Sequence, residues 1–513
     1  MTTLSSVCLF APRPPVVILG VPFDVVTRGE AVALIEQMVA ARRPHYVVTP
    51  NVDFLVQASE DIELRRILFD AHLVVCDGTP LVWASRWLGN PLPERVAGSD
   101  LVPLLISLAA QKGYRIFFLG ATEAAAERAV ANLRSRYPEL IIAGHYSPPF
   151  NQLLEMDHER IRERIAHARP DLLLVGFGCP KQEKWIAMHY RALDVPVVAG
   201  VGGTIDFLAG HIKRAPLWMQ HAGAEWVFRL SQEPQRLFHR YRKDLWVFGR
   251  SILRQWWQLR PQHKFRRCFA SSRRLETSAL PVGETKGGSL EPWDAAVHRF
   301  ELPCRMDCGT VSQGCLRPDR LPQPDRHWFL DGSRVEFIDS TGVGWLIRFH
   351  KKLKASDCLL VLVAPSEAIR RALALLRLDN FFKVAENAGA AQEAIEGRLG
   401  PPAVTMATTQ DGVAPGRTRV RWHGEVTAVE VAPIWEQTLA CLREKPFAES
   451  WQIDLSDVRF IDSSGLGLLV RLKKLARDSQ KDLALIGMQP AVQNVIKVAR
   501  LTEYLSETIC HCT

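Results

Sequence analysis

Polar side chains that could bind an anion or move a proton follow short apolar runs in the first half of this sequence. In segment 171–185, an apolar stretch leads into Gly176-Phe-Gly178, Pro180 and a helical pattern. A strand, a glycine turn and a helix N-terminus often bind anions, because backbone N–H groups and the helix dipole point outward there. Similar polar groups end other runs: Thr49, Asn51, Asp53, Asp77, Thr122, Lys181, Gln182, Glu183 and Asp206.

The apolar runs, such as residues 16–20, have the length of strands. They alternate with longer segments of helical periodicity, such as residues 28–41 and the segment for which Thr122 is the expected N-cap. This alternation predicts an α/β domain with a Rossmann-like, mostly parallel sheet covered on both faces. Ligands bind outside the carboxyl ends of the strands in such sheets, so we expect the polar groups on one rim. A single Asp at a strand end more often makes only a turn. The number of such residues on one predicted rim is what favours a site.

Several ligand classes are disfavoured. No Gly-x-Gly-x-x-Gly lies between a strand and a helix, and no Walker lysine motif is present. NAD and ATP are therefore poor candidates, and so is an oxidoreductase, whereas another phosphate-containing ligand fits. The 11 cysteines do not repeat a zinc-ribbon spacing, so no metal site is predicted.

Six motifs over roughly residues 15–250 resemble those of the WecG/TagA/CpsF glycosyltransferases, in the same order. They are Thr49-x-Asn51-x-Asp53, Asp77-Gly78, Arg95–Asp100, Gly176–Trp185, Gly200–Phe207, and Lys213–Gln220 followed by Glu225-Trp226. The resemblance implies an inverting transfer of a sugar from a UDP-sugar to a lipid-linked acceptor. It implies no cofactor and no metal.

The resemblance also implies roles for individual residues. Asp77 would be the general base, with Asp53 as the alternative, because inversion in one displacement needs one carboxylate beside the acceptor hydroxyl. Arg95 and loop N–H groups could stabilise the departing UDP. The implied substrate-binding residues are Thr49 and Asn51 near the sugar, Arg95 and Gln182 near the diphosphate or acceptor, and Gly176, Gly178, Gly202, Gly203 and Asp206.

Arginine and lysine interleave with aromatic residues in segment 213–261. This mixture is typical of a membrane interface, where aromatic rings lie at headgroup depth and basic groups meet phosphate. An ordinary basic helix packed on the domain is the alternative, and a nucleic-acid partner is disfavoured because no such module is recognisable. Our candidates for binding the acceptor diphosphate are Arg229, Arg236 and Arg240.

Bulk properties agree with a folded enzyme at a membrane surface. The chain has 513 residues, a formal net charge of +9 and 47% apolar residues, which suggests roughly three domains and an anionic partner. No apolar run reaches the roughly 18 residues that span a bilayer, and the first residues lack the basic region of a signal peptide. We therefore expect a cytoplasmic protein, peripheral at the inner face of the membrane.

An internal repeat follows a linker-like segment at 262–296. Residues 328–344 match residues 451–467 without a gap, including Asp339-Ser-Thr-Gly and Asp462-Ser-Ser-Gly. Both copies resemble the STAS domain of anti-sigma-factor antagonists, a small α/β module. In the second copy, a strand over 418–422 and a helix over 426–442 are expected before Trp451. Pro303, Pro318, Pro322 and Pro324 oppose a helix of matching length in the first copy, which is predicted to be degenerate. The predicted limits are 1–212, 213–261, 262–296, 297–396 and 403–508.

Ser463 and Ser340 occupy the position that a partner kinase phosphorylates in the STAS family. Added negative charge there would rearrange contacts with a docked partner, but STAS modules also serve as plain docking domains. A kinase or an anti-sigma-like regulator is thus an implied partner, beside the lipid-linked acceptor and the membrane. A homo-oligomer is compatible with the sequence, which does not specify the oligomeric state.

Together these patterns predict a glycosyltransferase of exopolysaccharide or cell-envelope glycan synthesis with two regulatory or docking STAS modules. The alternative is a signalling scaffold whose transferase domain is inactive. The retention of Thr49, Asn51, Asp77 and Gln182 argues against the scaffold. The sequence does not identify the donor sugar, the acceptor or the linkage.

Overall fold

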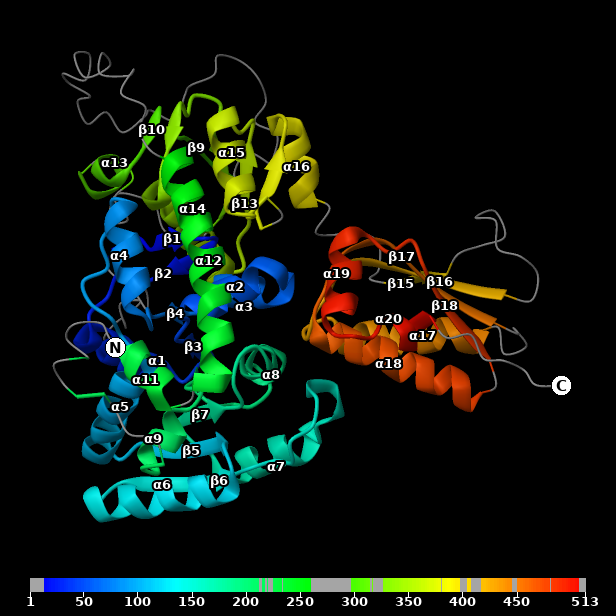
Figure 1. Cartoon of the computed structure of the whole chain (residues 1–513). Coiled ribbons are helices and arrows are strands. Elements are labelled where there is room, and N and C mark those ends of the chain that lie inside the picture. The colour runs from blue at the N-terminus through cyan, green and yellow to red at the C-terminus, as the bar shows by residue number, and fades with distance from the viewer. Residues whose placement is uncertain are drawn as a thin grey trace, which may run out of the picture.

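The computed structural model describes residues 13–211, 215–216, 219, 225–232, 234–259, 297–313, 316, 326–379, 381–396, 404–406, 417–444, 450–479 and 481–506. Figure 1 shows an N-terminal domain (residues up to 259), a first C-terminal domain (297–396) beside it and a second C-terminal domain (404–506) to one side. The predicted linker, 262–296, lies outside the described residues.

A six-stranded parallel sheet forms the centre of the N-terminal domain, in the order β4-β3-β8-β7-β5-β6. Its strands are β3 (His45–Val48), β4 (Leu73–Val74), β5 (Arg115–Gly120), β6 (Ile141–Tyr146), β7 (Leu172–Gly176) and β8 (Val197–Gly200). Neighbouring strands are in parallel register, as in the pairing of Leu172 with Val197. Buried apolar clusters cover both faces, which confirms the predicted fold class.

Helices follow the strands. They are α1 (Arg28–Ala41), α2 (Val52–Glu60), α3 (Ile62–Asp70), α4 (Thr79–Trp87), α5 (Gly98–Lys112), α6 (Glu123–Arg136), α7 (His158–Ala168), α8 (Lys181–His189) and α9 (Thr204–Leu208). Of these, α1, α2, α3, α6 and α7 begin at a polar side chain that caps the helix. Thr122 caps α6 by accepting from Ala125 N–H, as predicted. The strand predicted over 16–20 is shorter. β1 (Val16–Ile18) stops because Leu19 and Gly20 have positive φ and turn the chain into β2 (Val21–Phe23).

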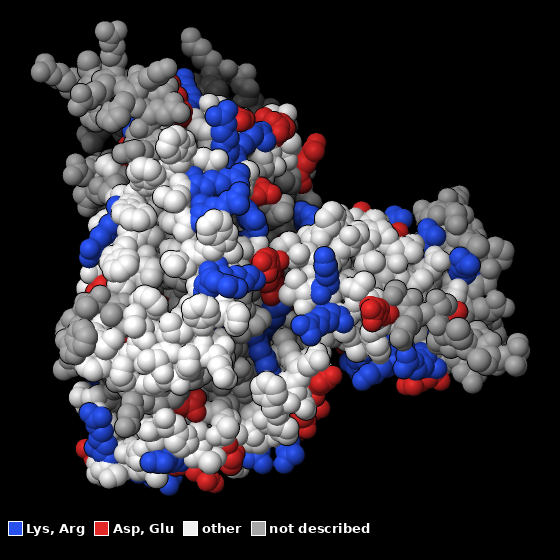
Figure 2. All heavy atoms as spheres, viewed as in Figure 1, with Lys and Arg blue, Asp and Glu red and all other residues white. Residues whose placement is uncertain are grey.

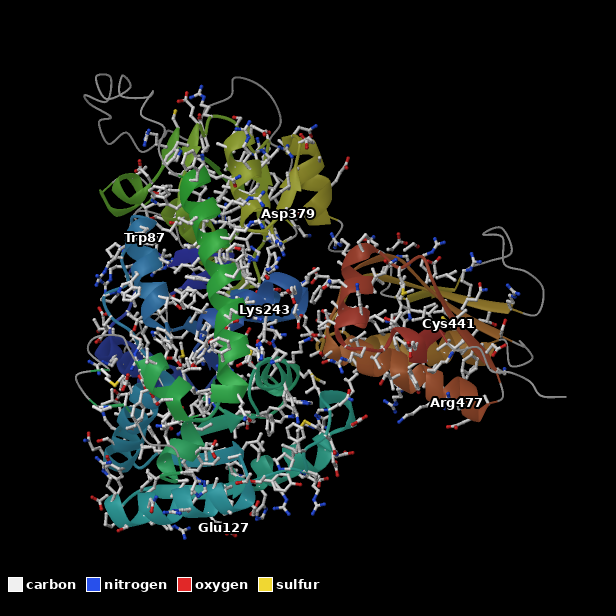
Figure 3. The ribbon with its side chains drawn as sticks, viewed as in Figure 1. Trp87, Glu127, Lys243, Asp379, Cys441 and Arg477 are labelled. Carbon is white, nitrogen blue, oxygen red and sulfur yellow. The ribbon has the colours of Figure 1, made fainter. Side chains whose placement is uncertain are left out.

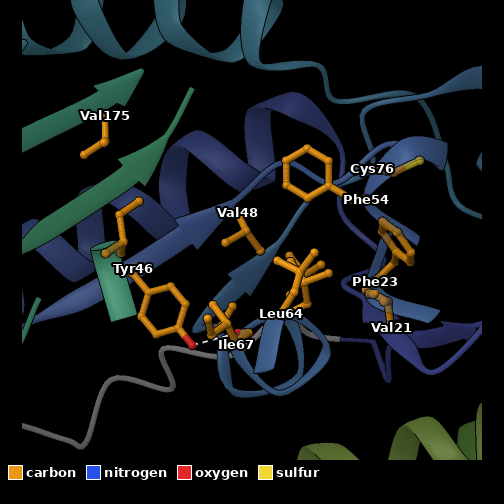
Figure 4. Packing of buried hydrophobic residues seen from close by; sticks show 14 of the residues in the cluster. Val21, Phe23, Tyr46, Val48, Phe54, Leu64, Ile67, Cys76 and Val175 are labelled. Atoms are coloured by element: carbon orange, nitrogen blue, oxygen red, sulfur yellow. Dashed lines mark hydrogen bonds between the residues drawn. The ribbon is translucent and has the colours of Figure 1, made fainter. Parts of the chain in front are cut away.

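Helix α3 is fixed to the sheet by apolar packing (Figure 4). Leu64 and Ile67 lie in the same buried cluster as Val48 and Phe54. The hydroxyl of Tyr46 on β3 donates to the carbonyl oxygen of Ile67 at 2.8 Å. The opposite side of α3 is therefore free to contact other parts of the chain.

Helices α11 (Glu225–Gln232) and α12 (Pro234–Leu259) come after α9, and the long α12 runs across the front of the domain in Figure 1. One side of α12 is buried through Phe248, Ile252 and Gln255, and the Gln255 side chain bonds the backbone at Leu19 (2.8 Å) and Val17 (2.7 Å). The described residues contain no helix both long and apolar enough to cross a membrane.

The first C-terminal domain has a parallel sheet in the order β14-β13-β11-β9. Its strands are β9 (Val297–Glu301), β11 (His327–Asp331), β13 (Leu360–Val363) and β14 (Lys383–Ala385), with a separate pair β10 (Arg305–Met306) and β12 (Phe337–Ile338). Its helices are α13 (Cys308–Gln313), α14 (Ser340–Ala355), α15 (Glu367–Leu375) and α16 (Ala388–Glu396).

The second C-terminal domain has the sheet order β15-β16-β17-β18, with β15 antiparallel. Its elements are β15 (Val404–Met406), β16 (Arg417–Val426), α17 (Val431–Glu444), β17 (Ser450–Ile461), α18 (Ser463–Asp478), β18 (Asp482–Ile486), α19 (Pro490–Val498) and α20 (Thr502–Ser506). The predicted helix start at Val426 is wrong, because Val426 pairs with Ile461 in the sheet. The 14-residue α17 compares with 6 residues in α13, so the first copy is degenerate as predicted.

Candidate active site

A cavity of about 740 Å³ opens where the carboxyl ends of β3, β4 and β8 meet α4, α11 and α12. Thr49, Asn51 and Asp77 line it from the sheet, as the sequence predicts for one rim. Apolar and aromatic side chains also line it: Trp83 and Trp87 of α4, Phe207 of α9, and Phe238, Leu245, Phe248 and Ile252 of α12.

The three polar residues of the rim are fixed by the backbone around them. The N–H of Asp77 donates to the carbonyl oxygen of Pro50 at 3.0 Å, which joins the ends of the two neighbouring strands. The Thr49 hydroxyl donates to the carbonyl oxygen of Gly200 at 3.3 Å, and Asn51 caps α2 by accepting from Phe54 N–H at 3.3 Å. The side chain of Asp77 is half-buried and faces the cavity.

Arg95 lines the same cavity and bridges two carboxylates. Its Nη1 lies 2.5 Å from Glu225 Oε2 on α11, and its Nη2 lies 3.0 Å from Asp100 Oδ2 on α5. Burial alone would lower the pKa of Arg95, but Glu225 and Asp77 hold it above its usual value. The guanidinium therefore ties α11 to the rim of the sheet.

Gln182 lines the cavity from α8, but its side-chain amide already forms hydrogen bonds with neighbouring protein groups. Its Oε1 accepts from Gly202 N–H at 2.9 Å, and its Nε2 donates to Glu183 Oε1 at 2.6 Å. Gly202 has φ of +51° and lines the cavity together with Gly203. Gln182 thus fixes the Gly202 turn.

The glycine turn of segment 171–185 contributes packing rather than cavity wall. Gly176, Gly178 and Asp206 are not among the residues that line the cavity, contrary to the expectation that they contact substrate. A Cβ at Gly176 would lie 2.9 Å from the carbonyl oxygen of Gly202, so a glycine is needed for the close approach of the two loops. Asp206 instead lies in the first turn of α9.

Three charged residues from α2 and α12 meet in the cavity. Arg240 Nη1 lies 3.8 Å from Asp53 Oδ2, and Asp244 lines the cavity beside them. Burial and the nearby Asp53 carboxylate raise the pKa of Asp244 to about 6. Arg240 therefore lines the cavity, and its predicted contact with the acceptor diphosphate stays a prediction. The side chains of Arg229 and Arg236 lie outside the described residues.

An aromatic face borders the cavity opening. Trp83 and Trp87 lie one turn apart on α4 and are 49% and 59% exposed, and Leu245 and Trp246 on α12 are 74% and 72% exposed. Trp87 lies at the end of α4 in Figure 3. In Figure 2, few charged atoms cover this side of the molecule, whereas lysine and arginine gather beside α12, where Figure 3 labels Lys243.

Among the described residues, one cluster has the side-chain atoms to hold a metal ion: Glu123, Glu127 and His145. It joins α6 to β6, and none of its members lines the cavity.

Four residues of this site have no role predicted from the sequence: Glu225, which stands only as part of a motif, and Asp244, Trp83 and Trp87. Asp244 could have been found as the single acidic residue of the otherwise basic segment 234–259. The tryptophans could have been found from their i, i+4 spacing directly after Asp77-Gly78.

The buried Glu183, next to the cavity residue Gln182, is expected to make the stability of the folded protein depend on pH. Burial raises its pKa from about 4.5 to about 7, so the folded state holds a proton that the unfolded state releases. The free energy of unfolding is then expected to fall by up to about 3 kcal/mol as pH rises from 4.5 through 7. Denaturant titrations of the wild type and Glu183→Gln would show this slope and its loss. Glu159→Gln, at an exposed glutamate of α7, should keep it.

Comparison with known proteins places the N-terminal domain among glycosyltransferases. Residues 16–262 match the family model described as "Glycosyl transferase WecG/TagA/CpsF family". Two Staphylococcus aureus proteins, from strains MW2 and NCTC 8325 / PS 47, are both named N-acetylglucosaminyldiphosphoundecaprenol N-acetyl-beta-D-mannosaminyltransferase. Each is 33% identical, over 222 and 214 residues respectively. The alignments cover 43% and 41% of this chain and 85% and 82% of the relatives.

The C-terminal part matches two further family models. Residues 268–391 match the model described as "STAS domain", and residues 410–507 match "Mlab, STAS domain". The two matches overlap the two copies of the internal repeat, so both predicted STAS modules are confirmed.

Proposed function

Because the chain belongs to the WecG/TagA/CpsF family of glycosyltransferases, we propose that it transfers a sugar from a UDP-sugar to a polyprenyl-diphosphate-linked acceptor in cell-envelope glycan synthesis. The relatives named above carry a diphosphoundecaprenol acceptor in their names. The donor of this chain is inferred from the family resemblance of its motifs. The transfer inverts the anomeric configuration and uses no metal.

The observation that carries the proposal is the position of Asp77 in the cavity. Its half-buried carboxylate lines the cavity together with Thr49 and Asn51, and apolar residues of α4 and α12 line the same cavity. A sugar at the rim would contact the polar residues, while a lipid-linked acceptor could approach along the apolar residues. One carboxylate between two such ligands suits a single displacement.

The reaction follows from this arrangement. Asp77 takes the proton of the acceptor hydroxyl as the acceptor oxygen attacks the anomeric carbon. The new carbon–oxygen bond forms on the face opposite to the bond that breaks, and UDP leaves with the bonding electron pair. Asp77 then returns the proton to solvent.

Arginines of α12 are the candidates for balancing the diphosphate charges. Arg240 and Arg242 both line the cavity, and Arg240 is half-buried beside Asp53. Arg95 has a different role here, because Glu225 and Asp100 already occupy both of its terminal nitrogens. It organises the cavity, and its charge reaches the leaving group only at longer range.

The exposed aromatic face supports a peripheral position at an anionic membrane. Tryptophan rings partition to the headgroup region, and lysine and arginine contact lipid phosphate. The tryptophans of α4 and the exposed residues of α12 would face the lipid, with the cavity opening toward the acceptor. This orientation brings a membrane-bound acceptor to Asp77 without removing its lipid from the bilayer.

Replacing Trp83 and Trp87 together with alanine tests this orientation. Transfer to a long-chain acceptor in vesicles is expected to fall about 10-fold or more, since each exposed aromatic anchor contributes on the order of 1 kcal/mol. Transfer to a water-soluble, short-chain acceptor should fall by a clearly smaller factor, which measures what the two rings contribute as lining of the cavity. Equal losses with both acceptors would contradict a membrane role. Val429→Ala, at an exposed residue of the second C-terminal domain, is the matched control.

The STAS domains are proposed to regulate or dock the enzyme. Ser463 and Ser340 are 4% and 1% exposed, and their hydroxyls donate to Glu63 and to the carbonyl oxygen of Leu88. A kinase could reach Ser463 or Ser340 only after the contact of that serine with the N-terminal domain opens. Phosphorylation of both serines, and a regulatory partner, remain predictions.

A transfer assay distinguishes the proposed enzyme from an inactive scaffold. The full chain would be incubated with vesicles that contain a polyprenyl-diphosphate-linked sugar and, in turn, a panel of UDP-sugars. Formation of the extended lipid with release of UDP is expected for one donor. No transfer with any donor, and no shift of the unfolding temperature by any UDP-sugar, would support the scaffold instead.

A further inference from the structure

The second C-terminal domain contacts the N-terminal domain through the helix end that carries Ser463. The hydroxyl of Ser463 donates to Glu63 Oε2 at 2.8 Å, and its backbone N–H donates to Glu63 Oε1. Ser463 is 4% exposed and Glu63 is 2% exposed. A carboxylate on α3 of the same chain therefore occupies the N-terminus of α18.

The contact continues to the helix that carries Gln182. Lys184 Nζ lies 2.8 Å from Glu63 Oε2 and 2.8 Å from Asp61 Oδ2. Burial alone would lower the pKa of Lys184, but Glu63 and Asp61 raise it, so the ammonium is firmly paired. Lys184 lies on α8 two residues after Gln182, which holds the Gly202 turn in the cavity.

The same contact reaches a second helix of the active site. Asp61 ends α2 and caps α3, accepting from Leu64 N–H at 3.0 Å. Helix α2 begins at its cap Asn51 on the cavity rim. The second C-terminal domain is thus linked to α8 and to the end of α2 through Glu63, Lys184 and Asp61.

Charged groups also surround this contact. Arg66 on α3 pairs with Glu425 at 2.5 Å, and its guanidinium lies 4.4 Å from the centre of the Phe460 ring. Ile62 and Leu154 add apolar contacts with the core of the second C-terminal domain. An interface with this many charged groups can be rehydrated at modest cost, as in transient interfaces between domains.

The first C-terminal domain is attached differently. Val17, Phe69 and Leu259 of the N-terminal domain lie in one buried apolar cluster with the core of the first C-terminal domain. A Cβ at Gly344 of α14 would lie 1.9 Å from the carbonyl oxygen of Pro15, which shows how closely the two parts pack. The first C-terminal domain also makes polar contacts, such as Lys354 with Asp70 at 3.0 Å, but among the described residues only its interface is built on a shared apolar core. The interface of the second C-terminal domain is therefore the better suited to reversible release.

We propose that the second C-terminal domain docks reversibly on α3 and α8 of its own chain. The Ser463–Glu63 contact holds it in place, and negative charge at Ser463 releases it. A second anion against Glu63 in this buried setting would be repelled, because water does not screen the pair. None of the described residues that line the cavity belongs to this domain. Docking therefore acts through α8 and Gln182 rather than by blocking the cavity.

Hydrogen–deuterium exchange of the full chain tests the docking without relying on the proposed activity. Ser463→Asp is expected to raise the exchange rates of the first turn of α18 and of α3 by at least about 10-fold. This factor corresponds to the loss of one hydrogen bond to a charged group. Ser464→Asp places the same charge one residue later, at a half-exposed side chain, and should leave the rates unchanged. Adding Glu63→Gln to Ser463→Asp should restore protection, because the amide can donate to the new carboxylate.

Controls separate release from unfolding. The amides of the buried strand β17 should stay protected in Ser463→Asp. If they do not, Glu63→Ala removes the same contact from the other domain and is expected to expose the first turn of α18. Wild-type exchange rates in Glu63→Ala, or in a folded Ser463→Asp protein, would overturn the proposal.

The coupling to α8 rests on the proposed function and has its own readout. We expect Ser463→Asp to raise the KM for the sugar donor about 3-fold or more, with a smaller effect on kcat, since Gln182 positions the cavity turn. An unchanged KM in a protein that has lost protection at α3 would overturn the coupling while leaving the docking intact. A failure of the proposed function would appear differently, as absent transfer in the wild type.

Discussion

Replacing Asp77 with asparagine is expected to lower kcat for sugar transfer by about 10²–10⁴-fold, the usual contribution of a positioned general base. Asparagine has nearly the same shape, so the rim formed with Thr49 and Asn51 should stay in place. The neutral amide cannot accept the proton of the acceptor hydroxyl. Because that proton moves only during the reaction, we expect the affinity for the donor to change little.

Steady-state kinetics and donor binding, measured on the same preparations, test this expectation. Asp206→Asn is the matched control, because Asp206 was also predicted at the site but is not among the residues that line the cavity. It should keep kcat within about 3-fold of the wild type. Asp53→Asn tests the alternative base. A larger loss of kcat in Asp53→Asn than in Asp77→Asn would reverse the assignment.

The parallel sheet and the polar rim could be predicted because each depends on local pattern. Strand-length apolar runs separated by helical periodicity indicate parallel strands, and the carboxyl ends of such strands share one edge. Thr49, Asn51 and Asp77 meet on that edge, as expected. Helix α1 likewise has the predicted bounds, Arg28–Ala41, because Thr27 and Glu30 form a capping box at its start.

The glycine turn at 176–178 shows where local pattern is insufficient. The sequence correctly indicates a strand, a tight turn and a helix, but that pattern does not specify what the turn approaches. Gly176 packs against the Gly202 carbonyl and Ile205, and the Gln182 side chain forms hydrogen bonds with Gly202 and Glu183. Both facts depend on contacts between β7 and β8, whose residues are more than 20 positions apart in sequence.

Glu63 shows the same limit between domains. In the sequence it is one charged residue in the first turn of an ordinary helix, and its partner Ser463 is 400 residues away. The repeat predicts that the serine loop contacts a separate partner, which stays a prediction, whereas the contact with Glu63 of the same chain was not predicted. Which surface it contacts depends on domain packing that no single segment encodes.

Replacing Arg95 with alanine is expected to lower the free energy of unfolding by about 3 kcal/mol, because removal of one partner leaves largely buried carboxylates uncompensated. The side chain of Arg95 is 19% exposed, and those of Glu225 and Asp100 are 12% and 14% exposed. Without the guanidinium, Glu225 would repel Asp100 and move α11 away from the rim. We therefore expect kcat/KM to fall by about 100-fold as well, since α11 lines the cavity.

A double-mutant cycle separates this bridging role from direct contact with the leaving group. In Arg95→Ala, the further change Glu225→Gln removes one uncompensated charge and should restore roughly half of the lost stability. If Arg95 acts mainly by holding α11, kcat/KM should recover together with stability. Recovery of stability without any recovery of kcat/KM would instead assign Arg95 to the diphosphate of the donor. Arg128→Ala on α6, where the arginine is exposed, is the control, and it should change neither quantity measurably because single exposed charges contribute little.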